Sequence, residues 1–172
     1  VLLGIFVVVQ YNGLVKLRNL VDNAWSQIDV QLQRRTDLIP NLVETVKGYA
    51  AHERETLDAV TRARGAVMTA EGPGAKAEAD NMLSGTLKSL FAVAEAYPDL
   101  KANQNFMQLQ EELTATEDKV AYARQYYNDN VTRLNTKIET FPAMLFAGMA
   151  KATHREYFET APEGRDPVQV QF

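Results

Sequence analysis

Apolar residues in the first part of the chain recur at intervals of three and four positions. They fall at Leu14, Leu17, Val21, Ala24, Ile28, Leu32, Ile39, Leu42, Val46 and Tyr49. This spacing is typical of an amphipathic helix with one buried face. Pro40 lies within the run, and a proline inside a helix removes one backbone hydrogen bond. Because the same face resumes in phase after Pro40, the pattern predicts one kinked helix rather than two helices.

The same spacing predicts two shorter helices in the middle of the chain. The first of them begins near Glu53 and ends before the sequence EGPG at 71–74, since glycine and proline favour turns. The second covers 75–97 and ends before Pro98, because the residue before a proline avoids the helical region. The residues on its apolar, buried side are expected to be Met82, Leu83, Leu87, Leu90, Phe91 and Ala94.

A long last helix is predicted over about 105–140, with Asn103 or Asn105 as its N-cap. Apart from the final VQVQF, no segment alternates with the period of two that a strand requires. The fold class is therefore all-α, an elongated antiparallel up-and-down bundle of four helices. The first and last helices would be roughly 53 Å long and the other two near 30 Å. These lengths predict a four-helix bundle continued by a two-helix stalk over residues 14–141.

The chain opens with the uncharged sequence VLLGIFVVV. As a helix these residues span about 14 Å, roughly half of a 30 Å bilayer core. A buried strand or the end of a signal peptide are the alternatives, although no small-residue cleavage site follows. We expect residues 1–13 to form the C-terminal half of a transmembrane anchor helix. Its lipid-facing residues would be Val1, Leu2, Leu3, Ile5, Phe6, Val7, Val8 and Val9.

Residues 141–150, FPAMLFAGMA, form a second run without charge. This run is either a short helix that caps the bundle or a contact with a membrane interface or another subunit. We assign 142–159 to a membrane-proximal or oligomer-contact segment and 160–172 to an extended tail, which could pair as an edge strand with a partner. The candidate interaction residues are Phe141, Met144, Leu145, Phe146, Met149 and Phe172.

Charge and composition disfavour several classes of function. The net charge of −4 and pI near 5.3 argue against nucleic-acid binding, which usually needs a basic face. The chain has no cysteine, which excludes disulfides, thiolate catalysis and cysteine zinc sites. His52 and His154 belong to neither a Glu-x-x-His pair nor an H-E-x-x-H motif. We therefore expect no metal, no cofactor and no small-molecule substrate.

Catalytic motifs are equally hard to find. No serine lies in a G-x-S-x-G elbow, and EGPGAK lacks the ending of a phosphate-binding loop. The chain is expected not to be an enzyme. An unrecognised active site would need convergent carboxylates, for which the candidates are Glu44, Glu111, Glu112 and Glu117.

Two polar positions have predicted environments. Arg35 continues the heptad series 21, 28, 35 and 42. One possibility is that Arg35 is buried and paired with Glu117 or Asp118. The other, which we favour, is that its aliphatic carbons pack against the protein while its guanidinium group reaches water. Tyr126 and Tyr127 are adjacent and therefore face different sides, so one is expected in the core and the other at the surface.

Several segments together resemble the LemA family. They are YNGLVKLRNLVDNAWSQIDVQLQRRTDLIPNLVETVKGYAAHE, AVTRAR, AYPDLKANQNFMQLQEEL, ARQYYNDNVTRLNTKIETFP and REYFE, and they cover nearly the whole chain in order. The resemblance implies a bacterial membrane protein with one transmembrane helix and an elongated up-and-down helical bundle. It implies no catalytic residues. A magnetosome-associated branch of the family exists, but no residue here singles it out.

The predicted function is a membrane-tethered helical scaffold or adaptor that self-associates. The alternative is an accessory or regulatory subunit of a membrane enzyme complex, such as a protease or transporter, whose helices would cover the stalk. The predicted location is the bacterial cytoplasmic membrane, spanned once. Lys16 and Arg18 follow the apolar run and favour a cytoplasmic bundle.

Overall fold

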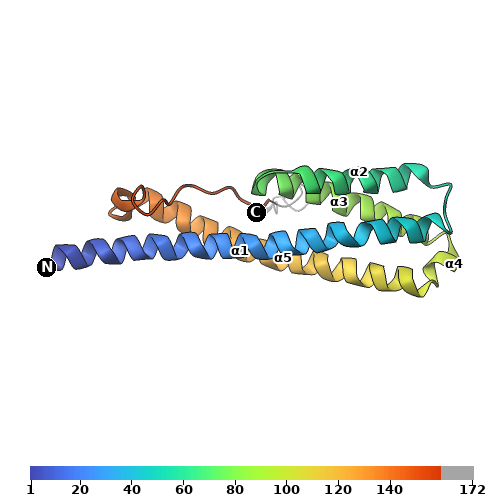
Figure 1. The fold of residues 1–172 in the computed structure, drawn as a ribbon, viewed down its shortest axis with the longest axis horizontal. Coiled ribbons are helices and arrows are strands. Elements are labelled where there is room, and N and C mark those ends of the chain that lie inside the picture. Colours follow the sequence, from blue (N-terminus) through green and yellow to red (C-terminus); the bar gives the residue numbers. More distant parts are fainter. Residues whose placement is uncertain (160–172) are drawn as a thin grey trace, which may run out of the picture. The chain divides into compact units, whose positions relative to one another are not determined.

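The structure, a computed structural model, describes residues 1–159, and over this range it is all-α as predicted. The elements are α1 (Leu2–Lys47), α2 (Arg54–Thr69), α3 (Pro73–Ala94), α4 (Pro98–Lys101), α5 (Gln104–Glu139) and the 3-10 turn η1 (Ala143–Phe146) (Figure 1). No strand occurs among the residues described. The predicted tail at 160–172, including Phe172 and the proposed edge strand, lies outside them.

Two compact units share the long helices. Unit 1 contains Val1–Gln31 and Asp118–Tyr157, and unit 2 contains Leu32–Glu117 with Phe158 and Glu159. The first part of α1 and the last part of α5 belong to unit 1, and the remaining parts of both helices belong to unit 2. Over residues 1–159 we find no helix with an apolar run long enough to cross a membrane.

In unit 2, α1 continues through Pro40 because its lost hydrogen bond is replaced. Proline has no N–H to donate to the carbonyl of Thr36, four residues earlier. That carbonyl instead accepts a hydrogen bond from Arg64 Nε of α2, at 2.7 Å. A buried backbone acceptor therefore keeps a partner, and the prediction of one helix rather than two is confirmed.

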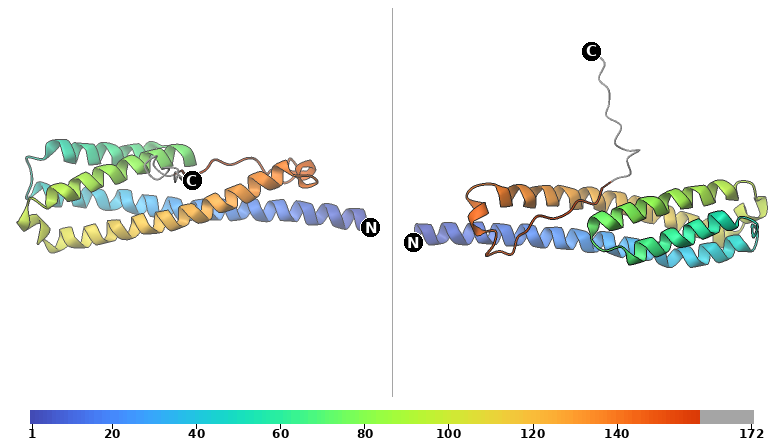
Figure 2. Two further views of the ribbon diagram at one scale, coloured as in Figure 1. Left: turned by 180° about the vertical axis from the view of Figure 1, so that it is seen from behind. Right: turned by 90° about the horizontal axis from the view of Figure 1, so that it is seen from above.

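Unit 2 packs α2 and α3 against each other and along the second part of α1 (Figure 2). Most of the predicted apolar stripe is buried, including Leu42, Leu57 and Leu87. Phe91 of α3 meets Phe106 of α5 edge to face, with ring centroids 6.1 Å apart. These contacts join all four long helices into one core.

The turns of unit 2 follow local chemistry. Gly72 adopts a φ of 83°, which favours glycine, and Pro73 opens α3, where its missing N–H costs nothing. Asn103 caps α5, since its side-chain oxygen accepts a hydrogen bond from the N–H of Phe106 at 3.0 Å. Pro98 opens the short helix α4, which was not predicted, and α3 already ends at Ala94.

Two residues of the predicted stripes are exposed. Tyr49 follows the end of α1 at Lys47, so the helical phase no longer sets its direction. Met82 precedes the buried Leu83, and adjacent residues of a helix face different sides. Both burial predictions are wrong for these reasons.

Unit 1 pairs the first part of α1 with the last part of α5. Leu14, Val21 and Ile28 face Val131 and Leu134 in its core, all fully buried. A third segment completes it, because the chain returns along the two helices after α5 (Figures 1 and 2). The predicted stalk of two helices is therefore wrong in this respect.

The returning segment is tied to both helices of unit 1. Arg155 forms an ion pair with Asp22 of α1 at 2.8 Å and two hydrogen bonds with Asn135 of α5. Trp25 of α1 lies 5.6 Å from Tyr127 of α5, measured between ring centroids, and the Tyr127 hydroxyl donates to the Glu156 carbonyl. Polar groups on this face of unit 1, among them the buried Tyr127, thus find partners in the third segment.

Candidate interaction surface

The first turns of α1 are exposed on nearly every side. Leu14 is the first fully buried residue of the helix, and Lys16 is its first charged residue. Val7 is half-buried, and the other large residues of the predicted anchor are exposed. These are Val1, Leu2, Leu3, Ile5, Phe6, Val8 and Val9.

Residues 141–150, which we call the apolar turn, show an inverted pattern of burial. Its alanines face the protein: Ala143 is 4% exposed, Ala147 8% and Ala150 0%. Its large side chains face outward, and Phe146 is half-buried. The exposed fractions are 72% for Phe141, 50% for Met144, 63% for Leu145 and 66% for Met149.

The apolar turn is held in place by defined hydrogen bonds. Arg18 Nη1 of α1 donates to the Ala150 carbonyl at 2.7 Å, and the Ala152 N–H donates to the Ala147 carbonyl at 2.9 Å. Lys151 has a φ of 50°, a left-handed conformation that reverses the chain at the end of the turn. The exposed side chains are thus presented by a fixed backbone.

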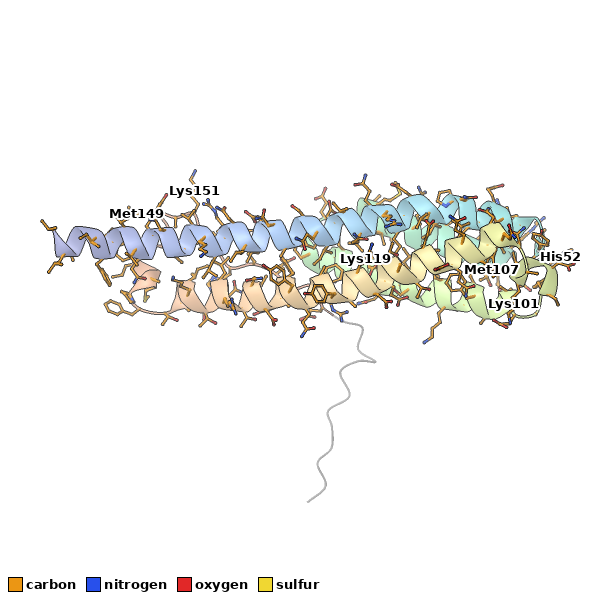
Figure 3. The ribbon with its side chains drawn as sticks, turned by 90° about the horizontal axis from the view of Figure 1, so that it is seen from below. His52, Lys101, Met107, Lys119, Met149 and Lys151 are labelled. Carbon is orange, nitrogen blue, oxygen red and sulfur yellow. The ribbon has the colours of Figure 1, made fainter. Side chains whose placement is uncertain are left out.

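Both apolar stretches lie at the same end of unit 1 in every view (Figure 2). This agrees with the prediction that residue 141 returns to the end at which α1 begins. Four cations adjoin this end: Lys16, Arg18, Lys137 and Lys151. Lys137 Nζ lies against Gly13 of α1, and Lys151 projects away from the ribbon (Figure 3).

Anionic side chains are scarce at the same end. Glu139 is the one carboxylate residue in 1–21 and 134–153, and its Oε1 lies 2.7 Å from Nε2 of His154. The structure therefore places the predicted anchor residues and the predicted contact residues within 141–150 at one end of unit 1, together with four cationic side chains.

Comparison with known sequences identifies the relatives of this chain. The family model described as LemA family matches residues 24–172. The chain belongs to the LemA family. It is 29% identical over 143 residues to Protein LemA of Metamycoplasma hominis, covering 81% of this chain and 65% of that protein. It thus spans about two thirds of that relative's length.

Magnetosome proteins are among the relatives of this LemA family chain. Magnetosome protein MamQ 2 of Paramagnetospirillum magneticum is 26% identical over 185 residues, which cover 92% of this chain and 68% of that protein. Magnetosome protein MamQ of Magnetospirillum gryphiswaldense is 24% identical with the same coverage.

This LemA family chain also carries a groove of about 580 Å³ within unit 1. Its lining combines exposed apolar residues with amides, one carboxylate and one ammonium group. The lining residues are Ser26, Gln27, Val30, Gln31, Asp118, Lys119, Tyr122 and Ala123. The side-chain oxygen Oε1 of Gln31 is buried and has no hydrogen-bond partner among the described residues.

None of the four glutamates proposed for an unrecognised active site lines this groove. Glu44 pairs with Lys47 at 3.5 Å, and Glu112 accepts a hydrogen bond from Gln108 at 3.3 Å. His52 is exposed, and residues 1–159 contain no cluster of three histidines or carboxylates able to hold a metal ion.

A buried ion pair in unit 2 corrects the prediction for Arg35. The side chain is 1% exposed, so the predicted snorkelling position is wrong. Its partner is Asp80 of α3, at 2.7 Å, instead of Glu117 or Asp118, and Arg35 also donates to Ser84 Oγ at 2.9 Å. The sequence held a signal for this partner, because Asp80 precedes Leu83, Leu87, Leu90 and Ala94 at helical spacing on the buried face of α3.

Tyr127 is buried and Tyr126 exposed, as expected for one of each. Burial raises the pKa of Tyr127 from 10.0 to about 12, while the nearby Arg155 charge acts in the opposite direction. The protonated hydroxyl donates to the Glu156 carbonyl at 2.7 Å. Sequence reasoning placed the ring but missed this link to the returning segment.

Proposed function

We propose that this LemA family chain is a non-catalytic helical scaffold tethered to the bacterial cytoplasmic membrane by a single spanning helix. Residues 1–13 would contribute the C-terminal part of that helix, and the bundle would lie on the cytoplasmic side. The observation that carries the proposal is the apolar end of unit 1. There, uncharged residues 1–9 leave their side chains exposed, and cations follow at Lys16 and Arg18.

The non-catalytic role is supported by the chemistry of the groove. Its lining offers one carboxylate and one ammonium group among amides and apolar side chains. A catalytic site commonly positions an acid or base beside a nucleophile or an oxyanion donor. The names of the quoted relatives, Protein LemA and magnetosome protein MamQ, also describe no reaction.

Self-association through the groove is the assembly that we propose. Val30 and Tyr122 are 60% and 79% exposed, although both lie on helices whose other faces form the core of unit 1. A second copy of the chain would cover both residues and could donate a hydrogen bond to the buried Gln31 oxygen.

The accessory subunit of a membrane enzyme complex remains the second candidate function. The same groove favours it, because a helix from another membrane protein fits the same apolar and amide lining. The structural difference between the two candidates is the occupant of the groove, which is a second copy of the chain for the scaffold and a different membrane protein for the accessory subunit.

Purification of the intact membrane protein in mild detergent, followed by native mass measurement, tests both candidates. A multiple of the chain mass supports the scaffold, and a foreign membrane protein in constant ratio supports the accessory subunit. The double substitution Val30→Ser and Tyr122→Ser should release the partner, whereas Met68→Ser, exposed in unit 2, should not. A monomer without any partner would contradict both functions.

A further inference from the structure

We propose that the apolar turn is a second lipid contact, which inserts into the headgroup region of an anionic bilayer beside residues 1–9. The partner is the lipid surface itself. This inference rests on the proposed membrane tether and adds to it a site that fixes how unit 1 meets the bilayer.

The first argument is the inverted burial of the turn. Full burial of a large apolar side chain contributes roughly 1.5–3 kcal/mol. A segment that only capped unit 1 would gain most by burying Phe141, Leu145 and Met149. The fold instead buries the alanines and leaves these large side chains in contact with the surroundings.

The second argument is charge. Arg18 and Lys151 adjoin the apolar turn, Lys16 and Lys137 lie at the same end of unit 1, and Glu139 is the one carboxylate residue in 1–21 and 134–153. Cations near a bilayer attract anionic headgroups with about 1 kcal/mol each. Apolar residues surrounded by lysine and arginine are typical of segments that lie in the interface between lipid and water.

The third argument favours lipid over a protein partner. Lipid tails offer no hydrogen bonds, so a backbone that enters them must satisfy its own polar groups. Within the turn, the N–H groups of Met144, Leu145 and Ala150 donate to carbonyls within 140–146, and those of Lys151 and Ala152, which follow it, donate to carbonyls of the turn. The ten residues of the turn also carry no charged side chain that a protein partner could recognise.

The absence of cysteine makes a direct test simple. A single cysteine is placed at Leu145→Cys, at Val8→Cys or at the exposed control Met107→Cys, and is labelled with an environment-sensitive fluorophore. The full chain is then reconstituted into vesicles of phosphatidylcholine with phosphatidylglycerol. The proposal expects labels at 145 and 8 to shift to blue emission and to be quenched by lipid-borne quenchers, whereas the label at 107 stays in water.

The outcomes separate this inference from the proposed function. A label at 145 that stays in water while the label at 8 enters lipid would overturn the second contact and leave the tether intact. If the labels at 145 and 8 both stay in water, both the second lipid contact and the proposed membrane tether would be overturned. A shift at 145 that needs no vesicles and grows with protein concentration would show a contact between copies, which also overturns the proposal.

Charge substitutions provide an independent measurement. Replacing Lys16 and Lys151 with glutamine should reduce the quenching at 145 and weaken binding to phosphatidylglycerol vesicles by roughly tenfold to thirtyfold. Replacing Lys88 and Lys101, which are exposed in unit 2, should have little effect. Equal effects of the two pairs would contradict a local contact between the apolar turn and anionic lipid.

Discussion

The two connections that flank α5 differ in whether their large apolar side chains are buried or exposed. The connection before the helix, 95–103, buries Leu100 completely and exposes Glu95, Asp99 and Lys101. The connection after it, 140–152, buries small alanines and exposes Phe141 and other large side chains. Both contain a proline and a short helical turn, α-helical in the first and 3-10 in the second.

Folding within unit 2 accounts for the first connection. Leu100 fills the core, Tyr97 donates to Glu53 at 3.1 Å, and Asn103 caps α5. The second connection is ordered by its backbone, yet its large side chains gain nothing from the fold. The proposed membrane contact would supply an apolar environment for these side chains outside the chain.

The largest expected difference between the two connections is the loss of unfolding free energy when a carboxylate is introduced into each. Leu100→Asp buries a charge in a filled core and should cost about 4 kcal/mol or more of unfolding free energy. Leu145→Asp changes an exposed residue and should cost less than about 0.5 kcal/mol. Denaturant unfolding followed by circular dichroism measures both. A similar loss in the two variants would contradict the comparison.

The buried ion pair of Arg35 and Asp80 tests how strongly the stability of unit 2 depends on a polar contact in its interior. Asp80→Ala should lower the unfolding free energy by about 3–4 kcal/mol, because the Arg35 charge then remains buried without its partner. The double substitution Arg35→Met and Asp80→Leu should recover most of this loss. An Asp80→Ala variant of unchanged stability would show that the pair is not formed.

The Arg64 side chain replaces the hydrogen bond that Pro40 removes. We therefore expect substitutions of these two residues to have coupled effects on the unfolding free energy. Arg64→Met keeps the packed stem but leaves the Thr36 carbonyl unpaired, at a cost of about 1–2 kcal/mol. Pro40→Ala supplies an N–H for that carbonyl, so it should stabilise the Arg64→Met protein more than the parent. A double-mutant cycle measures the coupling, and strictly additive effects would contradict it.

A further prediction, which depends on pH, concerns the segment that follows the apolar turn. Because its folded-state pKa is raised from 10.0 to about 12, Tyr127 contributes stability that is present below pH 10 and lost between pH 10 and 12. The parent should lose more stability than Tyr127→Phe across this window in pH-dependent denaturation. Parallel curves would mean that the hydroxyl is not buried against Glu156.

The helices were largely predictable because burial follows a repeating pattern. Leu14, Ile28 and Leu113 lie where the spacing places them. The heptad position of Arg35 indicated burial, but its partner depends on which helix packs against α1, and the pattern of α1 alone does not contain that information. The bond from Arg64 to Thr36 likewise arises only when α2 meets α1.

The sequence composition predicted an uncharged apolar segment at 141–150, but it did not predict which of its side chains face the protein. Its uncharged sequence predicted either a cap or a contact surface, and both alternatives fit FPAMLFAGMA equally well. Only the fold shows that Ala143, Ala147 and Ala150 face inward. Whether the outward side chains meet lipid depends on the surroundings and stays a prediction.

One paired measurement tests the central claim that the exposed side chains of the apolar turn serve a partner outside the chain. Met144, Leu145 and Met149 are replaced together by serine, and a control protein carries serine at Met68, Met82 and Met107, which are similarly exposed in unit 2. Unfolding free energy and affinity for phosphatidylglycerol-containing vesicles are measured on both proteins. The account predicts unchanged stability in both and vesicle affinity at least roughly tenfold weaker in the first alone. Equal vesicle affinity in the two proteins, or unfolding of the first, would contradict it.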